Sequence, residues 1–436
     1  MTTSTIKYHT LQHNNNLEGN LKIITDLVDS YLNKNQKENF LLSVNDNKTH
    51  SFIINKSHLV KNENLNIIQG LRKSPLDEIT YYHDEQGLGN SIFNKSGAIY
   101  MMDASSSIIS YYLKDYVKEN GLVLDLCAAP GGKSISLSLQ RDDLFFLCND
   151  ISFSRVIEMN KNFKRLGLKN MISISSKVKE IEKLNSIFDL VILDAPCSGS
   201  GMIRKDKKMI KDYSSNKVET NVLIQKELLS SANKLLKNNG LLLYSTCSFN
   251  VKENEEQIEE FISKYNYEVI DIKVDESIIK GKHGYHLIPG IFDGEGIYFC
   301  LLRKKEASPS IPLTSIRLTE VEGIPSFQYK NNYYVVSRMY KELLSLPLLS
   351  IGIKVLDEDT YNKHKYTHEF NTYIRDKYPS INISLEDATK YFNGEKLSTN
   401  LNLKDGYYFL NYNEIPISLS NKIGNKLQNL LPKRLR

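Results

Sequence analysis

The central part of this sequence predicts a doubly wound α/β fold, built on a parallel sheet with helices on both faces. Short apolar runs alternate there with helical segments, which is typical of parallel strands joined by helical crossovers. Several runs end in glycine, aspartate or asparagine, where an α/β sheet opens toward a ligand. The length of 436 residues exceeds the roughly 250–300 that one core holds, so we expect a smaller unit on each side.

The composition limits the classes of protein that fit. Hydrophobic residues make up 41%, too many for a disordered chain. The 56 basic and 51 acidic residues give a formal net charge of 56 − 51 = +5, which permits a nucleic-acid partner without requiring one. The five cysteines include no CxxC pair, so neither a disulfide framework nor a metal site is predicted. With no signal peptide and no run of about 20 apolar residues, we expect a cytoplasmic protein, and a monomer.

Residues 1–95 are expected to form a small α+β unit. An amphipathic segment predicts a helix over 19–32, and apolar runs predict strands over 40–44 and 50–54.

Residues 96–305 contain the predicted doubly wound core. Strands are expected at 122–126, 144–148, 172–174, 188–193, 241–244, 267–272 and 297–303. Helices are expected at 134–139 and 218–236, and from a cap at Ser152 to Gly167. Asn250 and Glu253 resemble a capping box that opens a further helix to residue 262.

Residues 306–436 are expected to form a linker and a third unit. The linker, 306–315, has two prolines, three serines and no apolar period. Strands are expected beyond it at 333–337 and 406–412. The last fifteen residues have five basic side chains and no acid, which suits phosphate contact or a solvated terminus.

A glycine-rich turn, in LDLCAAPGGKS at 124–134, follows the first core strand. Its small residues let a ligand approach the backbone, and the next helix directs free N–H groups toward that ligand. The spacing fits neither GxGxxG nor GxxxxGK[ST], which disfavours a dinucleotide or a nucleoside triphosphate. Asp150 ends the next strand, where an acid can bind a ribose diol. These features indicate S-adenosylmethionine; the alternative is an ordinary turn whose glycines serve packing.

Two cysteines follow the ends of two other core strands. Cys197 lies near Asp194 in LDAPCSGSG at 193–201, and Cys247 lies in YSTCS at 244–248. Ligands of open α/β sheets bind at the carboxyl ends of strands, so the thiols should meet beside the glycine-rich turn. A helix start near Asn250 would lower the pKa of the Cys247 thiol. Taken alone, either cysteine is a candidate nucleophile, an assisting thiol or an inert core residue.

Together these motifs resemble the Nop/Sun family of RNA (cytosine-5)-methyltransferases over about residues 80–305. The tail, 406–436, resembles the C-terminal RNA-binding region of the bacterial members that act on ribosomal RNA of the small subunit. The resemblance implies a Rossmann-like, S-adenosylmethionine-dependent methyltransferase core at 96–305. It also implies smaller RNA-binding α+β domains at 1–95 and 306–436.

The resemblance also assigns roles to residues. Cys247 is implied as the nucleophile that adds to carbon 6 of cytosine, and Cys197 as the thiol that assists proton removal at carbon 5 and release. Asp194 is implied to contact the cytosine ring or the methionine end of the cofactor. The implied cofactor-binding residues are Cys127, Ala128, Ala129, Pro130, Gly131, Gly132, Lys133 and Asp150, with Asp194. Where relatives have an acid near the adenine, this chain has Ser176.

Other interpretations stay open at this point. In one alternative, the same chemistry acts on transfer RNA. In another, the chain is a catalytically silent RNA-binding ribosome assembly factor. DNA cytosine-5 methyltransferases use the cysteine of a Pro-Cys pair, which would make Cys197 the nucleophile. His283 and His286 have no third ligand nearby, so we expect a loop rather than a metal site. Asp103 is a candidate for an assisting role or for a helix cap.

Overall fold

The computed structural model describes residues 15–45, 49–59, 61–205, 212–305, 311–356 and 366–435. Half of the predicted linker, 306–310, and the terminal Arg436 lie outside these ranges. Among the described helices, none has both the length and the apolar composition that crossing a bilayer requires.

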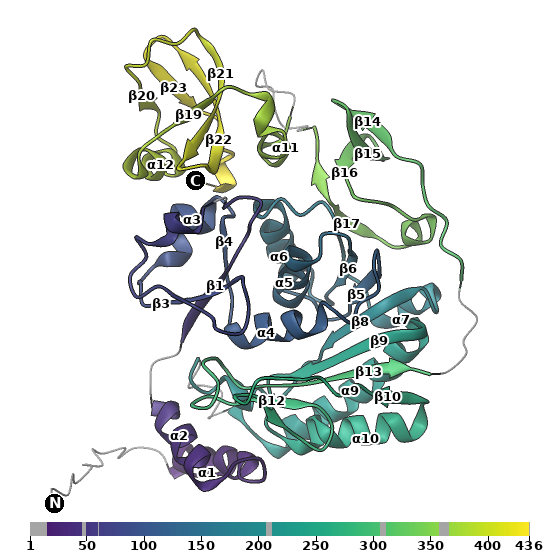
Figure 1. The fold of residues 1–436 in the computed structure, drawn as a ribbon. Helices are drawn as coiled ribbons and strands as arrows, with labels where there is room; N and C mark the ends of the chain where they lie inside the picture. The colour runs from purple at the N-terminus through teal and green to yellow at the C-terminus, as the bar shows by residue number, and fades with distance from the viewer. Residues whose placement is uncertain are drawn as a thin grey trace, which may run out of the picture.

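The core is a ten-stranded sheet in the order β11-β12-β13-β9-β8-β5-β6-β7-β17, with β10 paired to β13 (Figure 1). The five central strands are parallel: β5 Leu122–Asp125, β6 Phe145–Asn149, β7 Met171–Ile174, β8 Phe188–Asp194 and β9 Leu236–Thr246. Antiparallel strands extend it on the β9 side: β10 Tyr267–Val269, β11 Ile279–Lys280, β12 Tyr285–Leu287 and β13 Ile297–Lys304. The predicted doubly wound α/β class is confirmed, with a sheet that is mixed rather than wholly parallel.

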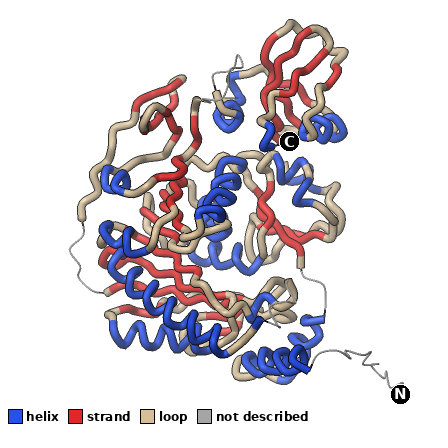
Figure 2. Tube along the Cα trace, turned by 180° about the vertical axis from the view of Figure 1, so that it is seen from behind, coloured by secondary structure: helices blue, strands red, loops and turns tan. Residues whose placement is uncertain are grey.

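Helices cover both faces of this sheet, and Figure 2 shows the same layers from behind. One face packs on α4 Ala104–Leu113, α5 Gly132–Gln140 and α6 Phe153–Arg165, and the other on α7 Val178–Ile181, α9 Ser215–Leu235 and α10 Glu255–Lys264. The alternation along β5 separates the two sides: Val123 joins the first apolar core, and Leu122 and Leu124 join the second. Short 3-10 turns lie at η3 Glu182–Leu184, η4 Ser200–Met202 and η5 Val251–Glu253.

The N-terminal part begins with two helices, α1 Asn15–Val28 and α2 Lys34–Asn45, which precede a four-stranded sheet in the order β2-β3-β1-β4. The strands are β1 His50–Ile54, β2 Arg72–Lys73, β3 Thr80–His83 and β4 Ile99–Met101, joined by η1 Asn62–Leu65, η2 Leu88–Asn90 and α3 Ile92–Lys95. The strand expected at 40–44 is wrong, because these residues lie in α2. Phe40 and Val44, four residues apart, are buried on one helix face, while Leu42 between them is 58% exposed.

The C-terminal part adds two smaller sheets. The first, in the order β14-β15-β16-β18, contains Thr319–Val321, Ile324–Tyr329, Asn332–Val335 and Ile353–Lys354. Within the same stretch, η6 Lys341–Ser345 precedes β17 Leu348–Ile351, which pairs with β7 at the edge of the core sheet. The second sheet has the order β19-β21-β22-β23-β20 and contains Ser380–Asn382, Gly406–Tyr412, Ile415–Ile423, Lys426–Asn429 and Leu397–Ser398. Its helical elements are α11 His368–Tyr373, η7 Arg375–Lys377, α12 Leu385–Phe392 and η8 Lys433–Leu435.

Candidate active site

A cavity of about 440 Å³ opens at the carboxyl ends of the central strands, where the sequence motifs converge. Its walls include Asp125 at the end of β5, Asp194 at the end of β8 and Cys247 just after β9. Parallel neighbours end at one edge of a sheet, so residues far apart in the chain meet there. The register places Asp194 directly opposite Ser245.

The turn after β5 forms one wall, lined by Ala128, Ala129, Pro130, Gly132 and Lys133. Gly131 lies behind this wall with a φ of 103°, and a Cβ there would lie 3.1 Å from atoms of Ile135, Met159 and Phe163. The backbone conformation therefore favours glycine, and a side chain here would also crowd these three residues. Cys127 is also set back from the cavity, and burial, followed by the charge of Asp125, raises the pKa of its thiol. Neither of these two predicted residues lines the cavity.

Two acids flank this turn. Asp150 is 2% exposed and forms an ion pair with Arg155, which lines the cavity, at 3.0 Å between Oδ2 and Nη1. Burial raises the pKa of Asp125 to about 7, although its Oδ2 accepts a hydrogen bond of 2.6 Å from Ser134 Oγ. From the sequence, neither Asp125 nor Arg155 was predicted to belong to the site. The position of Asp125 at the end of a strand could have identified it.

The residues present fit an adenosine-containing cofactor. Asp125 Oδ1 and Ser176 Oγ are buried with no hydrogen-bond partner in the described part of the chain. Asp125 lines the cavity and can receive a polar ligand there, whereas Ser176 does not belong to the lining. Ser176 lies just beyond β7, and its N–H donates to Asn149 Oδ1 at 3.0 Å. The cavity also falls in the range of about 300–1,000 Å³ typical of small-ligand sites.

The two thiols lie together, with 3.0 Å between Cys197 Sγ and Cys247 Sγ. The Cys247 backbone N–H also donates to Cys197 Sγ at 3.3 Å. The hydrogen bond from the Cys197 thiol lowers the pKa of Cys247, and the same contact, followed by burial, raises the pKa of Cys197. Both shifts arise from the contact between the two sulfur atoms, and they favour ionisation of Cys247 over ionisation of Cys197.

The cause of this asymmetry differs from the one expected. The α-helix begins at Glu255, not near Asn250, and the intervening residues form the 3-10 turn η5. Asn250 caps that turn by accepting from Lys252 N–H, but Glu253 does not complete a capping box. The acidity of Cys247 follows from its neighbouring thiol rather than from a helix N-terminus.

Asp194 and Lys133 form an ion pair near the two thiols, with 2.7 Å between Oδ2 and Nζ. Ser245 Oγ donates to the other carboxylate oxygen of Asp194, also at 2.7 Å. Lys133 is only 6% exposed, so its charge is directed at this carboxylate. The sequence reasoning missed Ser245, which lies two residues before Cys247.

The opposite wall comes from β4 and the residues after it, Tyr100, Met101, Met102 and Asp103. Asp103 caps α4 by accepting from Ser105 N–H at 3.0 Å, in agreement with the cap interpretation. His286 pairs with Glu255 at 2.6 Å and takes part in a structural contact. No group of three or more His, Cys, Asp or Glu in the described ranges is placed to hold a metal ion.

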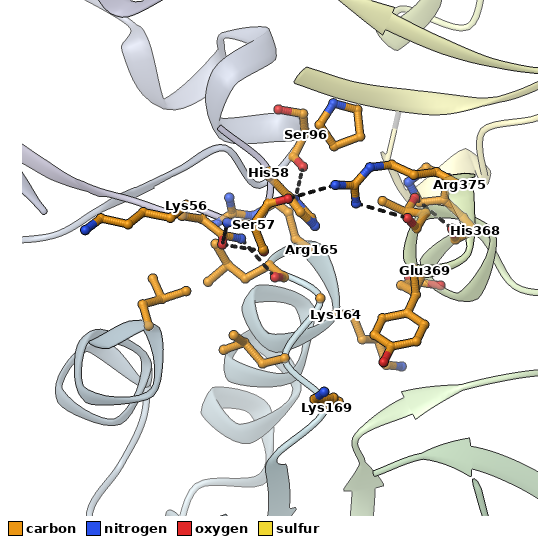
Figure 3. Close-up of a pocket in the computed structure, with 18 of the residues that line it drawn as sticks. Lys56, Ser57, His58, Ser96, Lys164, Arg165, Lys169, His368, Glu369 and Arg375 are labelled. Carbon is orange, nitrogen blue, oxygen red and sulfur yellow. Dashed lines mark hydrogen bonds between the residues drawn. The ribbon is translucent and has the colours of Figure 1, made fainter. Parts of the chain in front are cut away.

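A second cavity, of about 510 Å³, lies at the other ends of α5 and α6 (Figure 3). It separates the N-terminal sheet from α11, and Arg375 Nη2 bridges it to Ser57 O at 3.0 Å. Burial lowers the pKa of His58 there to about 4, and its Nδ1 contacts Ser96 O at 3.0 Å. This cavity contains no thiol and no residue of the three motifs, so we assign it to the junction between parts of the chain.

The fold and the site define a methyltransferase, and comparisons with known proteins specify its family. Residues 112–303 match the family described as 16S rRNA methyltransferase RsmB/F, and residues 378–436 match the methyltransferase RsmF PUA domain. The chain therefore contains an RsmB/F-family methyltransferase domain followed by an RsmF-type PUA domain. This confirms the family that the motifs indicated.

Individual relatives agree with this assignment. A protein of Aeromonas salmonicida named ribosomal RNA small subunit methyltransferase F is 28% identical over 80% of this chain and 81% of its own. A methyltransferase homolog from Pyrococcus horikoshii is 25% identical, with a TM-score of 0.56, over 67% of this chain and 100% of its own. The structure of NSun6 from Pyrococcus horikoshii with SFG has the same fold at 17% identity and a TM-score of 0.56, over 65% of this chain and 98% of its own.

Proposed function

We propose that this protein is an S-adenosylmethionine-dependent RNA (cytosine-5)-methyltransferase that acts on ribosomal RNA of the small subunit. The observation that carries the proposal is the contact between Cys197 and Cys247 beside a cofactor-like cavity. The name of the Aeromonas salmonicida relative supports the substrate, and the SFG in the NSun6 structure, an analogue of S-adenosylmethionine, supports the cofactor.

The cofactor would bind between the turn after β5 and Asp150. The lining residues of this turn would approach it with their backbone, and Asp150, held by Arg155, would accept the ribose hydroxyls. Ser176 would contact the adenine with its hydroxyl. S-adenosylmethionine supplies the methyl group when it is bound.

Cys247 would begin the reaction. Carbon 5 of cytosine is a poor nucleophile until a thiolate adds at carbon 6, because addition makes the ring enamine-like. The hydrogen bond from Cys197 keeps Cys247 more acidic than an ordinary thiol, so its thiolate is available. Asp194, fixed by Lys133 and Ser245, would contact the cytosine ring or the methionine end of the cofactor. The base must leave its stack to reach the thiol.

Cys197 would complete the reaction. Once Cys247 has become a thioether, its hydrogen bond and negative charge no longer raise the pKa of Cys197, and the Cys197 thiol can release its proton to solvent. Its thiolate then takes the proton from carbon 5. The electrons of that C–H bond restore the 5,6 double bond, and the bond between carbon 6 and Cys247 breaks. Cys247 leaves as a thiolate and Cys197 is again a thiol.

We also propose the expected division of labour along the chain. Residues 96–305 would form the catalytic domain, and residues 1–95 and 306–436 would bind RNA around it. The match of 378–436 to a PUA domain supports the second of these assignments. Both catalytic thiols must stay reduced, which fits a cytoplasmic location.

Two substitutions test the chemistry. Cys247→Ala should abolish methyl transfer, since no thiol adds to carbon 6. Cys197→Ala should instead trap a covalent RNA–protein adduct on a denaturing gel, because addition proceeds and release does not. An adduct trapped by Cys247→Ala would reverse the two roles and contradict the proposal.

The substrate RNA can be identified by bisulfite sequencing of ribosomal and transfer RNA from cells with and without the gene. The proposal expects a 5-methylcytosine that disappears from small-subunit ribosomal RNA. A position lost only from transfer RNA would keep the chemistry and reject the substrate. A protein that binds RNA but shows no S-adenosylmethionine binding by calorimetry would be an assembly factor.

A further inference from the structure

A buried carboxylate, that of Glu253, lies directly behind the two thiols. Glu253 is the last residue of η5, and it has 0% exposure. Its Oε1 accepts a hydrogen bond from Ser198 N–H at 2.8 Å. Its Oε2 accepts from the hydroxyls of Ser198 and Ser248, at 2.5 and 2.6 Å. These two serines immediately follow the two cysteines, so one carboxylate joins both thiol loops.

Gln225 of α9 completes this contact from the other side. Its Nε2 donates to Pro196 O at 2.9 Å and to Glu253 Oε1 at 3.3 Å, and it too has 0% exposure. The peptide before Cys197 is therefore held by Gln225, and the peptide after it by Glu253. With both flanking peptides fixed, the Cys197 side chain is directed at Cys247.

Burying a carboxylate is unfavourable unless hydrogen bonds replace its water. No Lys, Arg or His in the described ranges forms a salt bridge with Glu253, so the four donors from Ser198, Ser248 and Gln225 alone compensate its burial. Apolar side chains of similar volume would fill this space without that difficulty. A carboxylate supplies what an apolar side chain cannot, namely two acceptor oxygens that hold the two loops at a fixed distance from each other.

The carboxylate of Glu253 binds the backbone of one loop only, because it accepts from Ser198 N–H, whereas Ser248 N–H donates to Thr246 Oγ1 at 3.2 Å. Ser248 O accepts from Asn254 Nδ2 at 2.8 Å, and the bond of 2.8 Å from Gly201 N–H to Cys247 O ties the two loops together beyond Cys197. The backbone of Glu253 is fixed separately, since Tyr244 Oη donates to Glu253 O at 2.6 Å. Loss of the carboxylate should therefore loosen the peptide after Cys197 more than the backbone of Cys247.

We propose that Glu253, with Gln225, is the positioning residue that holds Cys197 against Cys247 and thereby controls release of the methylated RNA. Glu253 acts through Cys197 and does not touch the substrate. This inference rests on the proposed function, because release is a separate step only if Cys247 forms a covalent bond to the RNA. The negative charge of Glu253 also adds to the hydrogen bond and burial that keep Cys197 protonated.

The test compares Glu253→Gln with Cys197→Ala and the parent enzyme, using unmodified 16S ribosomal RNA transcript and S-adenosylmethionine with a labelled methyl group. We expect Glu253→Gln to transfer methyl groups in a single turnover, to fall at least tenfold in steady-state turnover, and to accumulate a covalent adduct. Gln225→Met should likewise lower steady-state turnover and accumulate adduct. It replaces Glu253→Gln in the test if that variant fails to fold. Glu259→Gln is the matched control, since Glu259 lies on the neighbouring α10 with 53% of its side chain exposed.

The outcomes separate this inference from the proposed function. A parallel fall of adduct and turnover in Glu253→Gln would show a merely structural role and overturn the inference, as would parent-like turnover. If Cys197→Ala accumulates adduct and neither Glu253→Gln nor Gln225→Met does, only the inference fails. If the parent enzyme makes no 5-methylcytosine in any ribosomal or transfer RNA, the proposed function fails.

Discussion

The contact between Gly201 and Gly296 fixes the backbone of Cys247 and gives a quantitative test of the site. Gly201 N–H donates to Cys247 O at 2.8 Å, and Gly201 O accepts from Gly296 N–H at 2.9 Å. A Cβ on Gly201 would lie 2.2 Å from Gly296 O and 3.0 Å from Cys247 O. Gly201 thus joins the η4 turn, the Cys247 loop and the start of β13, with no room for a side chain.

The magnitude follows from these distances. Ordinary contact of a Cβ begins at 3.4 Å, so Gly201→Ala must move the two backbones apart by about 1 Å. Forcing an extra carbon into a packed site costs about 1–3 kcal/mol. A displacement of about 1 Å at a reacting group can lower the rate by about 100-fold. We therefore expect a modest loss of stability and a large loss of turnover.

Two measurements check this prediction. Thermal unfolding should show a midpoint lowered by about 2–4 °C per kcal/mol lost. Methyl transfer to 16S ribosomal RNA transcript should fall by about 100-fold at saturating substrate. Gly89→Ala is the control, because a Cβ there meets only Met101 Cγ at 4.0 Å. If Gly201→Ala and Gly89→Ala both turn over within twofold of the parent, the Gly201 contact does not position Cys247.

Three further predictions concern charge and hydrogen bonding. Cys197→Ala should raise the pKa of Cys247, because the hydrogen bond that lowers it is lost, and the pH profile of Cys247 alkylation by iodoacetamide should move to higher pH. Asp125→Asn should stabilise the protein more at pH 8 than at pH 5 in thermal unfolding, because burial raises the pKa of Asp125 to about 7 and its ionisation then opposes folding. Tyr31→Phe removes a hydrogen bond of 3.0 Å to the Glu255 carboxylate and should lower the free energy of unfolding in urea by about 1.5–3 kcal/mol.

Each of these has a contrary result. An alkylation profile unchanged by Cys197→Ala would mean that the neighbouring thiol does not set the acidity of Cys247. An equal effect of Asp125→Asn at both pH values would mean that Asp125 is ionised throughout. For Tyr31→Phe, the matched variant is Tyr373→Phe, at a ring that is 36% exposed. Equal unfolding energies for the two variants would contradict the role of the Tyr31 contact.

The core strands were predictable because each is a short apolar run that ends in a polar or glycine residue. The strand expected at 406–412 coincides with β21 for the same kind of reason. The strand prediction for residues 40–44 failed because five apolar or small residues in a row fit a helix as well as a strand. The pairing of β17 with β7 was not predictable, since it joins positions more than 170 residues apart and no local pattern encodes it.

The candidate site divides in the same way. The rule that ligands bind at strand ends brought Cys197 and Cys247 together across 50 residues, and the structure places them 3.0 Å apart. Glu253 was interpreted as half of a capping box because its spacing from Asn250 fits one. Its actual partners, Ser198 and Gln225, come from two other elements, and a carboxylate turned inward has the same sequence signature as one turned outward.

The strand β4 belongs to two parts of the protein at once, and this bears on how RNA binding and catalysis are connected. It pairs with β1 in the N-terminal sheet, yet Tyr100 and Met101 line the catalytic cavity. Arg165 at the end of α6 donates to Ile99 O at 3.1 Å and ties the strand to the core. One continuous apolar core includes Phe52 of the N-terminal sheet together with residues of α4 and α5. Because the N-terminal sheet completes the cavity wall, any RNA bound by this sheet, as we propose, would be positioned relative to Cys247 by rigid packing.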